Sequence, residues 1–403
     1  MNKYTINGES IDSVDLKCLV ISRGVKVEKS VYKMFSSENR LNVNPLTCNC
    51  VIFSDGTIAQ LTDMGFHLRY LTGILSWDNL KLLRYAQQLE TPFSLKLVDT
   101  NKVALMHKDD FVDFITFPPP SDFYKQKTAA GLPYVGNSVI QGLDWVAFQC
   151  LWACEYATSG KACEFCFSGD AFHNMVQKGK KLPQAILASD VAEIIEYGIK
   201  QVGTSNIQIT GGSTLDGKKE ANYIHSYLTE INQRIGTANI QGEILLYITP
   251  PEDTKMIDEY FDLGANRIAC SLELWDEEKA RLVTPGKIEI STRQKYLDTL
   301  EYIANKYGNA KAFSNFIIGL EDFETLKEGT TELAKRGIMP AASIWMPMGR
   351  PVQNSMTPPD ISYYKRVKEW YAELYQKYDL EPVDSRGLNV CIERDIWNYS
   401  QLK

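Results

Sequence analysis

Several features are scarce or missing in this sequence, and each narrows what the protein can be. No apolar run approaches the roughly 20 residues that a membrane-spanning helix needs. The first residues mix both charges and contain no apolar core, so we expect no secretory signal peptide. Acidic residues outnumber basic ones and give a formal net charge of −7, which argues against a broad nucleic-acid surface. We therefore expect a cytoplasmic protein without a membrane span, for which nucleic acid is an unfavoured partner.

A disulfide framework is also not expected. The nine cysteines are an odd number in a long chain of 403 residues, which is typical of a protein from a reducing compartment. Hydrophobic residues make up 44% and charged residues 23%, as in ordinary globular proteins. The length is sufficient for one large domain and a smaller one.

The most informative feature is a group of cysteines in one short stretch. Cys163 and Cys166 are separated by two residues, and Cys154 lies upstream across a small polar loop. Cys150 precedes this loop at the end of a strand-like apolar segment. Thiolates gathered in a loop are ligands for zinc or an iron–sulfur cluster. Three close thiols would leave one metal position open, whereas a structural zinc site takes four ligands.

Two simpler explanations of these cysteines stay open at this point. All four could form a zinc knuckle, although their spacing resembles paired zinc ligands only loosely. They could also be buried thiols without a ligand, because free cysteine is among the most buried residue types.

Residues 1–120 are expected to form a small β-rich domain. Short segments rich in β-branched residues cover 16–29, 48–61 and 93–107, with turn signals at Ser54–Gly56 and Asp99–Lys102. A helical insert is expected over residues 77–89. Residues 121–137 then read as a linker, because Pro118 to Pro120 can neither join a strand ladder nor continue a helix.

From residue 138 to about 355 the pattern becomes regular, with strands and amphipathic helices in alternation. Expected strands cover residues 138–149, 206–212, 243–250, 267–274, 312–320 and 340–347. Alternation of this kind predicts a parallel sheet with right-handed crossovers. The six units are too few for a complete eight-unit barrel, so we expect an α/β fold, a six-unit (βα)6 partial TIM barrel. Residues 356–403 would add a C-terminal helix and tail.

Functional residues should lie at the carboxyl ends of these strands. The cysteine loop follows the first strand. The second ends in Thr210–Thr214, where two glycines allow a close approach of the backbone to a ligand. The fourth brings Ser271 and Glu273, and Glu273 could alternatively be a surface carboxylate paired with Arg267 or Arg281. The fifth ends with Ile317 and Gly319, and the sixth ends irregularly at Pro347–Pro351.

This layout resembles the radical S-adenosylmethionine (radical SAM) superfamily over roughly residues 138–350. The resemblance implies a 4Fe–4S cluster and S-adenosylmethionine as cofactors, with an electron donor such as flavodoxin or ferredoxin as partner. It also implies reductive cleavage of S-adenosylmethionine to a 5′-deoxyadenosyl radical that abstracts hydrogen from a small metabolite or peptide. By the same resemblance the cluster ligands are Cys154, Cys163 and Cys166, and the cofactor contacts are Gly211, Gly212, Ser213, Thr214, Ser271, Glu273, Ile317 and Gly319.

Two departures from the superfamily pattern concern the cysteines and the glycines. The usual gaps are three residues and then two, whereas here they are eight and two. The longer first gap is similar to the expanded loop of the Elongator catalytic subunit, and it makes Cys150 the rival of Cys154 as first ligand. The segment Gly211–Thr214 also lacks the acidic residue that usually follows the glycine pair.

Several residues outside this pattern have possible roles. Cys48 and Cys50 share one face of an expected strand and could bind a second metal with Cys391, although scattered core thiols are the simpler interpretation. His173 and Tyr247 are possible contacts to cofactor or substrate. Two other functions stay open: a non-catalytic or partner-dependent iron–sulfur or zinc protein, and an RNA-modifying radical SAM enzyme.

Overall fold

A computed structural model describes residues 1–28, 30–31, 34, 50–60, 91–119, 121–134, 137–151, 154–166, 179, 185–346, 357–387 and 390–402. A seven-stranded sheet forms its centre, in the order β15-β14-β13-β12-β11-β10-β9. Strands β10 to β15 are parallel and follow the chain order, whereas β9 pairs antiparallel with β10. The strands are β9 (Ser138–Gln141), β10 (Trp145–Leu151), β11 (Asn206–Gly211), β12 (Ile244–Tyr247), β13 (Arg267–Ala269), β14 (Ala312–Ile318) and β15 (Met339–Ile344).

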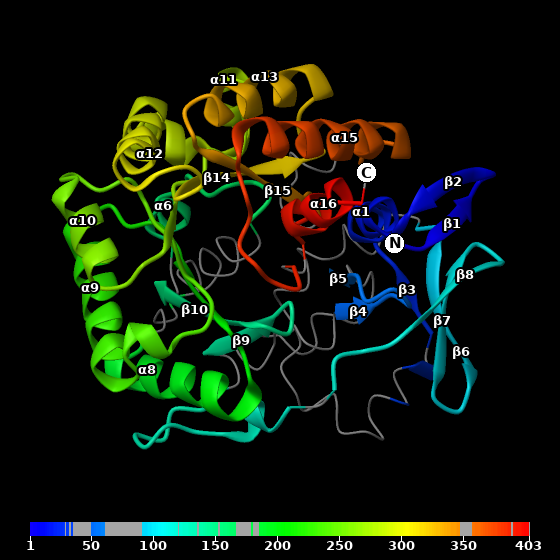
Figure 1. Cartoon of the computed structure of the whole chain (residues 1–403), viewed down its shortest axis with the longest axis horizontal. Coiled ribbons are helices and arrows are strands. Elements are labelled where there is room, and N and C mark those ends of the chain that lie inside the picture. The colour runs from blue at the N-terminus through cyan, green and yellow to red at the C-terminus, as the bar shows by residue number, and fades with distance from the viewer. Residues whose placement is uncertain are drawn as a thin grey trace.

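Helices cover the outside of this sheet, which curls into a half-barrel (Figure 1). This arrangement confirms the expected α/β partial TIM barrel. The helices of this region are α6 (Glu155–Thr158), α8 (Ala188–Tyr197), α9 (Gly217–Arg234), α10 (Lys255–Asp262), α11 (Glu277–Val283), α12 (Arg293–Tyr307), α13 (Phe323–Ala334), α15 (Ile361–Tyr378) and α16 (Glu393–Ser400), with the 3-10 turns η3 (Asp122–Lys125) and η5 (Thr237–Asn239) and the π-helices η4 (Gly198–Val202) and η6 (Lys287–Ser291). Within the described ranges, no helix is long and apolar enough to cross a membrane.

The first strand expected over residues 138–149 is in fact a hairpin of β9 and β10. Gly142 and Leu143 adopt φ values of 57° and 70°, which turn the chain back on itself. A glycine accepts this left-handed backbone easily, but a leucine rarely does, so the sequence pattern did not indicate the turn. The fourth expected strand is also shorter than predicted, because β13 ends at Ala269 and residues 270–274 follow an irregular path.

The N-terminal region pairs short strands in two-stranded and four-stranded sheets. Its elements are β1 (Lys3–Ile6), β2 (Glu9–Asp12), α1 (Ser13–Arg23), β3 (Lys26–Val27), β4 (Cys50–Ile52), β5 (Ile58–Gln60), β6 (Phe93–Asp99), β7 (Lys102–His107) and β8 (Asp110–Ile115). Both expected turns are present, between β4 and β5 and between β6 and β7. The helix expected over residues 77–89 lies outside the described residues.

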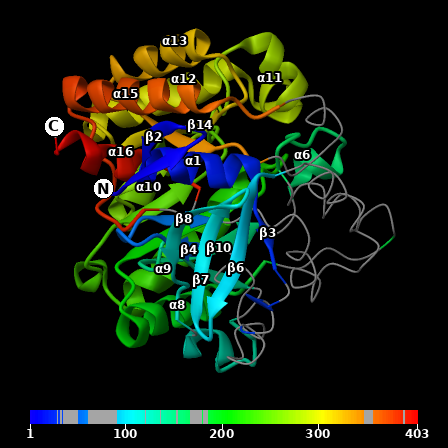
Figure 2. The same cartoon turned by 90° about the vertical axis from the view of Figure 1, so that its right-hand side faces the viewer.

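The strand expected over residues 16–29 is wrong, because residues 13–23 form helix α1. Asp12 and Asp15 form a capping box in which each side chain accepts a hydrogen bond from the other residue's backbone N–H. Lys368 of α15 lies within 2.6 Å of Asp12 and 2.7 Å of Asp15, and all three side chains are buried. Figure 2 shows α1 next to α15 and α16, and buried residues of α1 and of the sheet belong to one hydrophobic core.

One buried acid in the helix layer gives a test of this packing. Glu220 in the first turn of α9 is 5% exposed, and one of its carboxyl oxygens accepts a hydrogen bond from the Thr249 N–H at 2.7 Å. The other oxygen has no partner among the described residues. Burial raises the pKa of Glu220 to about 7 from an ordinary 4.5. The carboxyl is therefore neutral in the folded protein at a pH where the unfolded chain already ionises it.

We predict that Glu220→Gln stabilises the protein more at pH 8 than at pH 5. Because the folded pKa is raised, the favourable contribution of wild-type Glu220 is complete below about 4.5 and is lost as the pH rises through 7. A rise of this size corresponds to at most about 3 kcal/mol. Urea unfolding of both proteins at the two pH values measures the difference. Glu259→Gln changes an exposed residue on α10 and should have the same effect on stability at both pH values. Equal effects of Glu220→Gln at both pH values would contradict the buried neutral acid.

Candidate functional site

The cysteine loop lies at the carboxyl end of β10, as expected for a functional loop of this fold. Cys154 is the N-cap of the short helix α6, and a turn joins Cys163 to Cys166 through a 3.1 Å hydrogen bond from the Cys166 N–H to the Cys163 carbonyl. All three cysteine residues are partly exposed. The loop therefore presents its cysteines at a surface instead of burying them in the core.

The loop is fixed on one side to the glycine segment that follows β11. The Glu155 N–H donates to the Ser213 carbonyl at 2.8 Å, and the Gly212 N–H donates to the Leu151 carbonyl at 2.9 Å. The Glu155 carboxylate also accepts from the Leu215 N–H at 2.7 Å. A Cβ at Gly212 would lie 2.5 Å from the backbone nitrogen of Cys154, which no side chain tolerates. The glycine thus allows direct backbone packing of the two strand ends.

On its other side the loop contacts residues 283–291, which include η6. The Glu164 N–H donates to the Val283 carbonyl at 2.8 Å, and Lys161 forms an ion pair with Glu289. The Tyr156 hydroxyl lies 2.6 Å from the Ser291 hydroxyl. The cysteine loop is therefore held between the end of β11 and the segment after α11.

A buried ion pair lies next to the cysteines. The Lys287 ammonium donates to the Glu273 carboxylate and to the Ser271 carbonyl, both at 2.6 Å. Glu273 adopts a φ of 71°, a strained backbone that is typical of functional sites when a non-glycine residue adopts it. The alternative partners expected for Glu273 are wrong, because Arg267 pairs with Glu243 and Arg281 pairs with Glu277.

Electrostatic effects connect this pair to the thiols. Burial raises the pKa of the Cys163 thiol, and the nearby Lys287 ammonium acts in the opposite direction. For Lys287, burial opposes the charge, but Glu273 and Cys163 raise its pKa above the ordinary value. Lys287 therefore carries a permanent positive charge beside the cysteine loop.

The expected residues of the fifth strand lie in two different environments. Ile317 packs on a small apolar cluster that also receives Phe165 of the cysteine loop. Gly319 instead lies against α15, since its N–H donates to the Tyr363 hydroxyl at 3.3 Å and a Cβ there would meet Pro359 at 3.2 Å. Its φ of 105° requires glycine. Ile317 therefore packs with a residue of the cysteine loop, whereas Gly319 allows the chain to turn next to α15.

Thr214 and Cys150 face away from the site. The Thr214 hydroxyl donates to the Asp216 carbonyl at 2.7 Å within its own loop. Cys150 is 2% exposed and lies at an irregularity of β10, where it interacts electrostatically with Tyr227 of α9 and Tyr260 of α10. Its thiol therefore points into the helix layer, and burial raises its pKa.

The remaining candidates are separated from the cysteine loop or lie outside the described residues. Cys48, His173 and Pro347–Pro351 belong to the latter group. Cys50 is buried on β4, and the Cys391 thiol lies 3.3 Å from the Ser343 hydroxyl. Tyr247 ends β12 and contacts Phe313 inside the barrel.

The thiols fit an iron–sulfur cluster in their chemistry. They are soft donors on one loop, they are partly exposed, and a buried cation lies beside them. Among the residues that the structure describes, which include Cys154, Cys163 and Cys166, no group of three or more histidine, cysteine or acidic side chains is arranged so that it could hold a metal ion. The loop continues into residues 167–178, which lie outside the described part.

Lys287 is the residue of this site that the sequence analysis missed. It follows Glu273 by fourteen positions on a different element, and no spacing rule connects the two. A π-helix is the only local signal, because such helices occur frequently at functional sites, but it is visible in the structure alone.

Comparison with known proteins relates part of the chain to one family. Residues 159–328 match the model of the radical SAM superfamily, a range that includes Cys163 and Cys166 but begins after Cys154. The chain is 25% identical over 263 residues to bacteriochlorophyllide c C-7(1)-hydroxylase of Chlorobaculum limnaeum. This match covers 62% of the chain and 65% of the relative, so the chain spans less than two thirds of that protein's length.

Solved structures with a similar fold include HydG, a maturase of FeFe-hydrogenase, and methylornithine synthase. HydG has a TM-score of 0.43 and 14% identity, with 58% of this chain and 50% of that chain covered. Methylornithine synthase has a TM-score of 0.42 and 15% identity, with 62% and 68% covered. Similarity at this level carries no argument about this chain.

We predict that Gly212→Ala destabilises the protein by about 1–3 kcal/mol, as overpacking usually does. The added methyl group would force the β11 end away from Cys154 and break the hydrogen bond between Glu155 and Ser213. Gly217→Ala is the matched control, because its Cβ would meet only the Glu252 side chain, at 4.0 Å. Urea unfolding followed by circular dichroism measures the stability of both variants. The same stability for the two variants would show that the glycine contact is unimportant.

Proposed function

Because this chain carries a radical SAM domain, which makes it an enzyme of that superfamily, we propose that Cys154, Cys163 and Cys166 hold its 4Fe–4S cluster. Enzymes of the superfamily use this cluster together with S-adenosylmethionine. When bound, the two groups supply reductive cleavage of a carbon–sulfur bond and a 5′-deoxyadenosyl radical that removes hydrogen from a substrate. The observation that carries the proposal is the partly exposed cysteine loop fixed against the glycine end of β11.

Cys154 is a better first ligand than Cys150. The Cys150 thiol points into the helix layer and is nearly inaccessible, and a Cβ at Gly211 would lie 3.1 Å from its sulfur. Cys154 is partly exposed and belongs to the same loop as the other two thiols. Ligation by Cys150 would require its buried side chain to leave the helix layer.

The surroundings of the loop support a site for S-adenosylmethionine. Gly211 and Gly212 pack closely on residues 151 and 154, which brings the end of β11 next to the cysteine loop, where the methionyl end would bind, with Ser213 and Thr214 shaping their loop. Ser271 and Glu273 would hold polar groups of the cofactor, with Lys287 fixing their positions. Ile317 and Phe165 offer an apolar surface to the adenine, and Gly319 supports this strand end from behind.

We propose a small metabolite or a peptide as the substrate, with flavodoxin or ferredoxin as electron donor. Six strand–helix units within residues 138–355 would form the cytoplasmic enzyme's catalytic barrel. Residues 1–120 would be a β-rich domain that helps to bind or cover the substrate, joined by residues 121–137, and residues 356–403 would form the C-terminal helix and tail. A scaffold without catalysis would not need the glycine, carboxylate and ammonium groups that surround the thiols.

The first test is reconstitution of the cluster without oxygen, followed by incubation with S-adenosylmethionine and dithionite. We expect a brown protein that contains iron and sulfide and forms 5′-deoxyadenosine, detected by mass spectrometry. Cys154→Ala, Cys163→Ala and Cys166→Ala should each lose the cluster and the product, because a thiolate ligand is missing. Cys150→Ala is the matched control and should keep both.

Three outcomes would contradict parts of this proposal. Uptake of zinc instead of iron by all four cysteines would replace it with a structural metal site. An intact, reducible cluster without any 5′-deoxyadenosine would exclude the catalytic function. Loss of the cluster in Cys150→Ala but not in Cys154→Ala would show that Cys150 is the first ligand. The similarity to the radical SAM superfamily would be unaffected.

The second test concerns Lys287. We expect Lys287→Gln to make the cluster harder to reduce, because removal of a nearby positive charge disfavours an added electron. Iron content should be unchanged, since Lys287 is not a ligand. A redox titration followed by electron paramagnetic resonance measures the potential, and Lys255→Gln on exposed α10 is the control. If the reduction potential of the cluster is the same in Lys287→Gln and in the wild type, the Lys287 ammonium does not influence the cluster.

A further inference from the structure

The π-helix η6 carries Lys287 and lies between helices α11 and α12. It consists of five residues, follows Gly286 and ends at Ser291. A π-helix is a rare conformation that occurs frequently at functional sites, and it needs contacts from its surroundings to persist. The contacts that hold η6 therefore determine where Lys287 is placed.

One side chain of the cysteine loop, Tyr156, contacts both ends of η6. Its hydroxyl lies 2.6 Å from the hydroxyl of Ser291, the last residue of the element. Its ring packs on the backbone just before the element, since a Cβ at Gly286 would lie 2.7 Å from the ring atom Cδ2. Tyr156 and Ser291 are only 2% and 6% exposed, so their hydrogen bond is shielded from solvent. Tyr156 thus holds η6 at its start and at its end.

Two further residues of η6 contact the same loop. Glu289 forms an ion pair with Lys161, and Ile288 packs on the small apolar cluster that also receives Phe165. The ion pair is partly exposed and contributes little by itself, so the buried contacts are the stronger ones. These loop residues lie on both sides of Cys163 in the sequence. The backbone of η6 is therefore held by the segment that carries the thiols.

Lys287 connects this element to the ends of the strands. Its ammonium donates to the Glu273 carboxylate and to the Ser271 carbonyl, both at 2.6 Å. It also interacts electrostatically with Cys163 and Cys154. Because the Coulomb energy depends on distance, a displacement of η6 would change the effect of the ammonium on a charged group at these thiols.

Backbone strain at the end of η6 makes such a displacement easy once a contact is removed. Thr292 directly follows Ser291 and adopts a φ of 62°, which threonine rarely does. A strained backbone of this kind persists only where neighbouring contacts fix it. The hydrogen bond between Ser291 and Tyr156 is the adjacent contact, so its loss would allow the chain to relax.

We infer that Tyr156 is a positioning residue that sets, through η6, the distance between the Lys287 ammonium and the cluster on the cysteine loop. The inference rests on the function proposed above, because it concerns the cluster of that proposal. It also gives the long gap between Cys154 and Cys163 a role, since this gap supplies the side chain that holds η6.

Redox titration of the reconstituted enzyme, followed by electron paramagnetic resonance, tests the inference. Tyr156→Phe and Ser291→Ala each remove the same hydrogen bond from one of its two ends. We expect both variants to make the cluster harder to reduce, as Lys287→Gln does. The ratio of reduced to oxidised cluster at the wild-type midpoint should fall by about twofold or more, as is usual within one network of contacts. Iron content should be unchanged, because neither residue is a ligand.

A double-variant cycle separates positioning of Lys287 from other effects. If Tyr156 acts through the ammonium, Tyr156→Phe should have no further effect on the potential in the Lys287→Gln background. Tyr302→Phe is the matched control, because it removes a tyrosine hydroxyl that donates to Asp258 at 2.8 Å on the helices outside the sheet. It should leave the reduction potential unchanged.

Three results would overturn the inference while the cluster of the wild type is intact. The first is a wild-type potential in both Tyr156→Phe and Ser291→Ala. The second is a shift that keeps its full size in the Lys287→Gln background, because the effect would then reach the cluster through the loop itself. The third is loss of iron in both variants, which would show that the hydrogen bond only holds the loop together.

Failure of the proposed function gives a different result. A wild-type protein that takes up no cluster would overturn both proposals. A reducible cluster that forms no 5′-deoxyadenosine would overturn the catalytic function alone, since the potentials of the variants would still show whether Tyr156 positions Lys287.

Discussion

The sheet of this protein is curled but not closed, and this constraint determines where the chain must place its other parts. A closed barrel has no edge strand, whereas a partial barrel has an edge that exposes backbone donors and acceptors. Here residues 390–392 pair with β15, through hydrogen bonds of 2.9 Å from Ile344 to Val390 and from Ile392 to Ala342. The last segment of the chain is therefore part of the barrel wall, although it follows the sheet by almost fifty residues.

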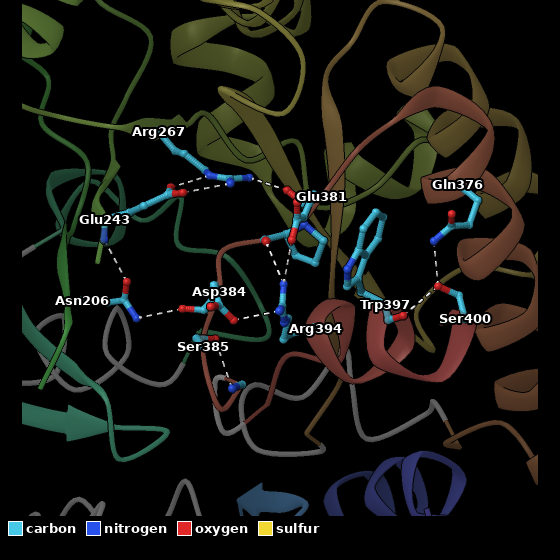
Figure 3. Close-up of polar contacts among 12 residues, drawn as sticks. Asn206, Glu243, Arg267, Gln376, Glu381, Asp384, Ser385, Arg394, Trp397 and Ser400 are labelled. Atoms are coloured by element: carbon cyan, nitrogen blue, oxygen red, sulfur yellow. Dashed lines mark hydrogen bonds and ion pairs between the residues drawn. The ribbon is translucent and has the colours of Figure 1, made fainter. Parts of the chain in front are cut away.

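Different segments of the chain lie at the two ends of this partial barrel. At the carboxyl ends of the strands lies the cysteine loop, fixed by backbone contacts to the ends of β11 and α11. At the amino ends lies the C-terminal segment, fixed by Arg267 and Arg394 (Figure 3). The first segment carries thiols, whereas the second carries the carboxylate of Glu393.

Charge is distributed differently at these two ends. Glu273 near the cysteines is neutralised by Lys287 within the protein, so the site keeps a buried cation that interacts with the thiols. Within the described part of the chain, Glu393 forms no ion pair, because nearby Lys17 pairs with Asp395 instead. Tyr247 lies between the two ends, because its hydroxyl interacts electrostatically with both Glu393 and Glu273.

The sequence by itself determined the class of fold and the end of the sheet that carries the cysteines. Both follow from local patterns: the alternation of strands and helices dictates parallel crossovers, and the spacing of Cys163 and Cys166 shows that their thiols share a loop. Leu143 and α1 were misjudged because a left-handed leucine and a short capping box compete with an apolar pattern that favours strands. Tertiary structure alone decided that Lys287 reaches Glu273, that Cys150 faces the helices, and that Glu393 enters the barrel. These three placements depend on the register of distant segments, which is set by packing and by backbone pairing across the sheet edge and has no signal in neighbouring residues.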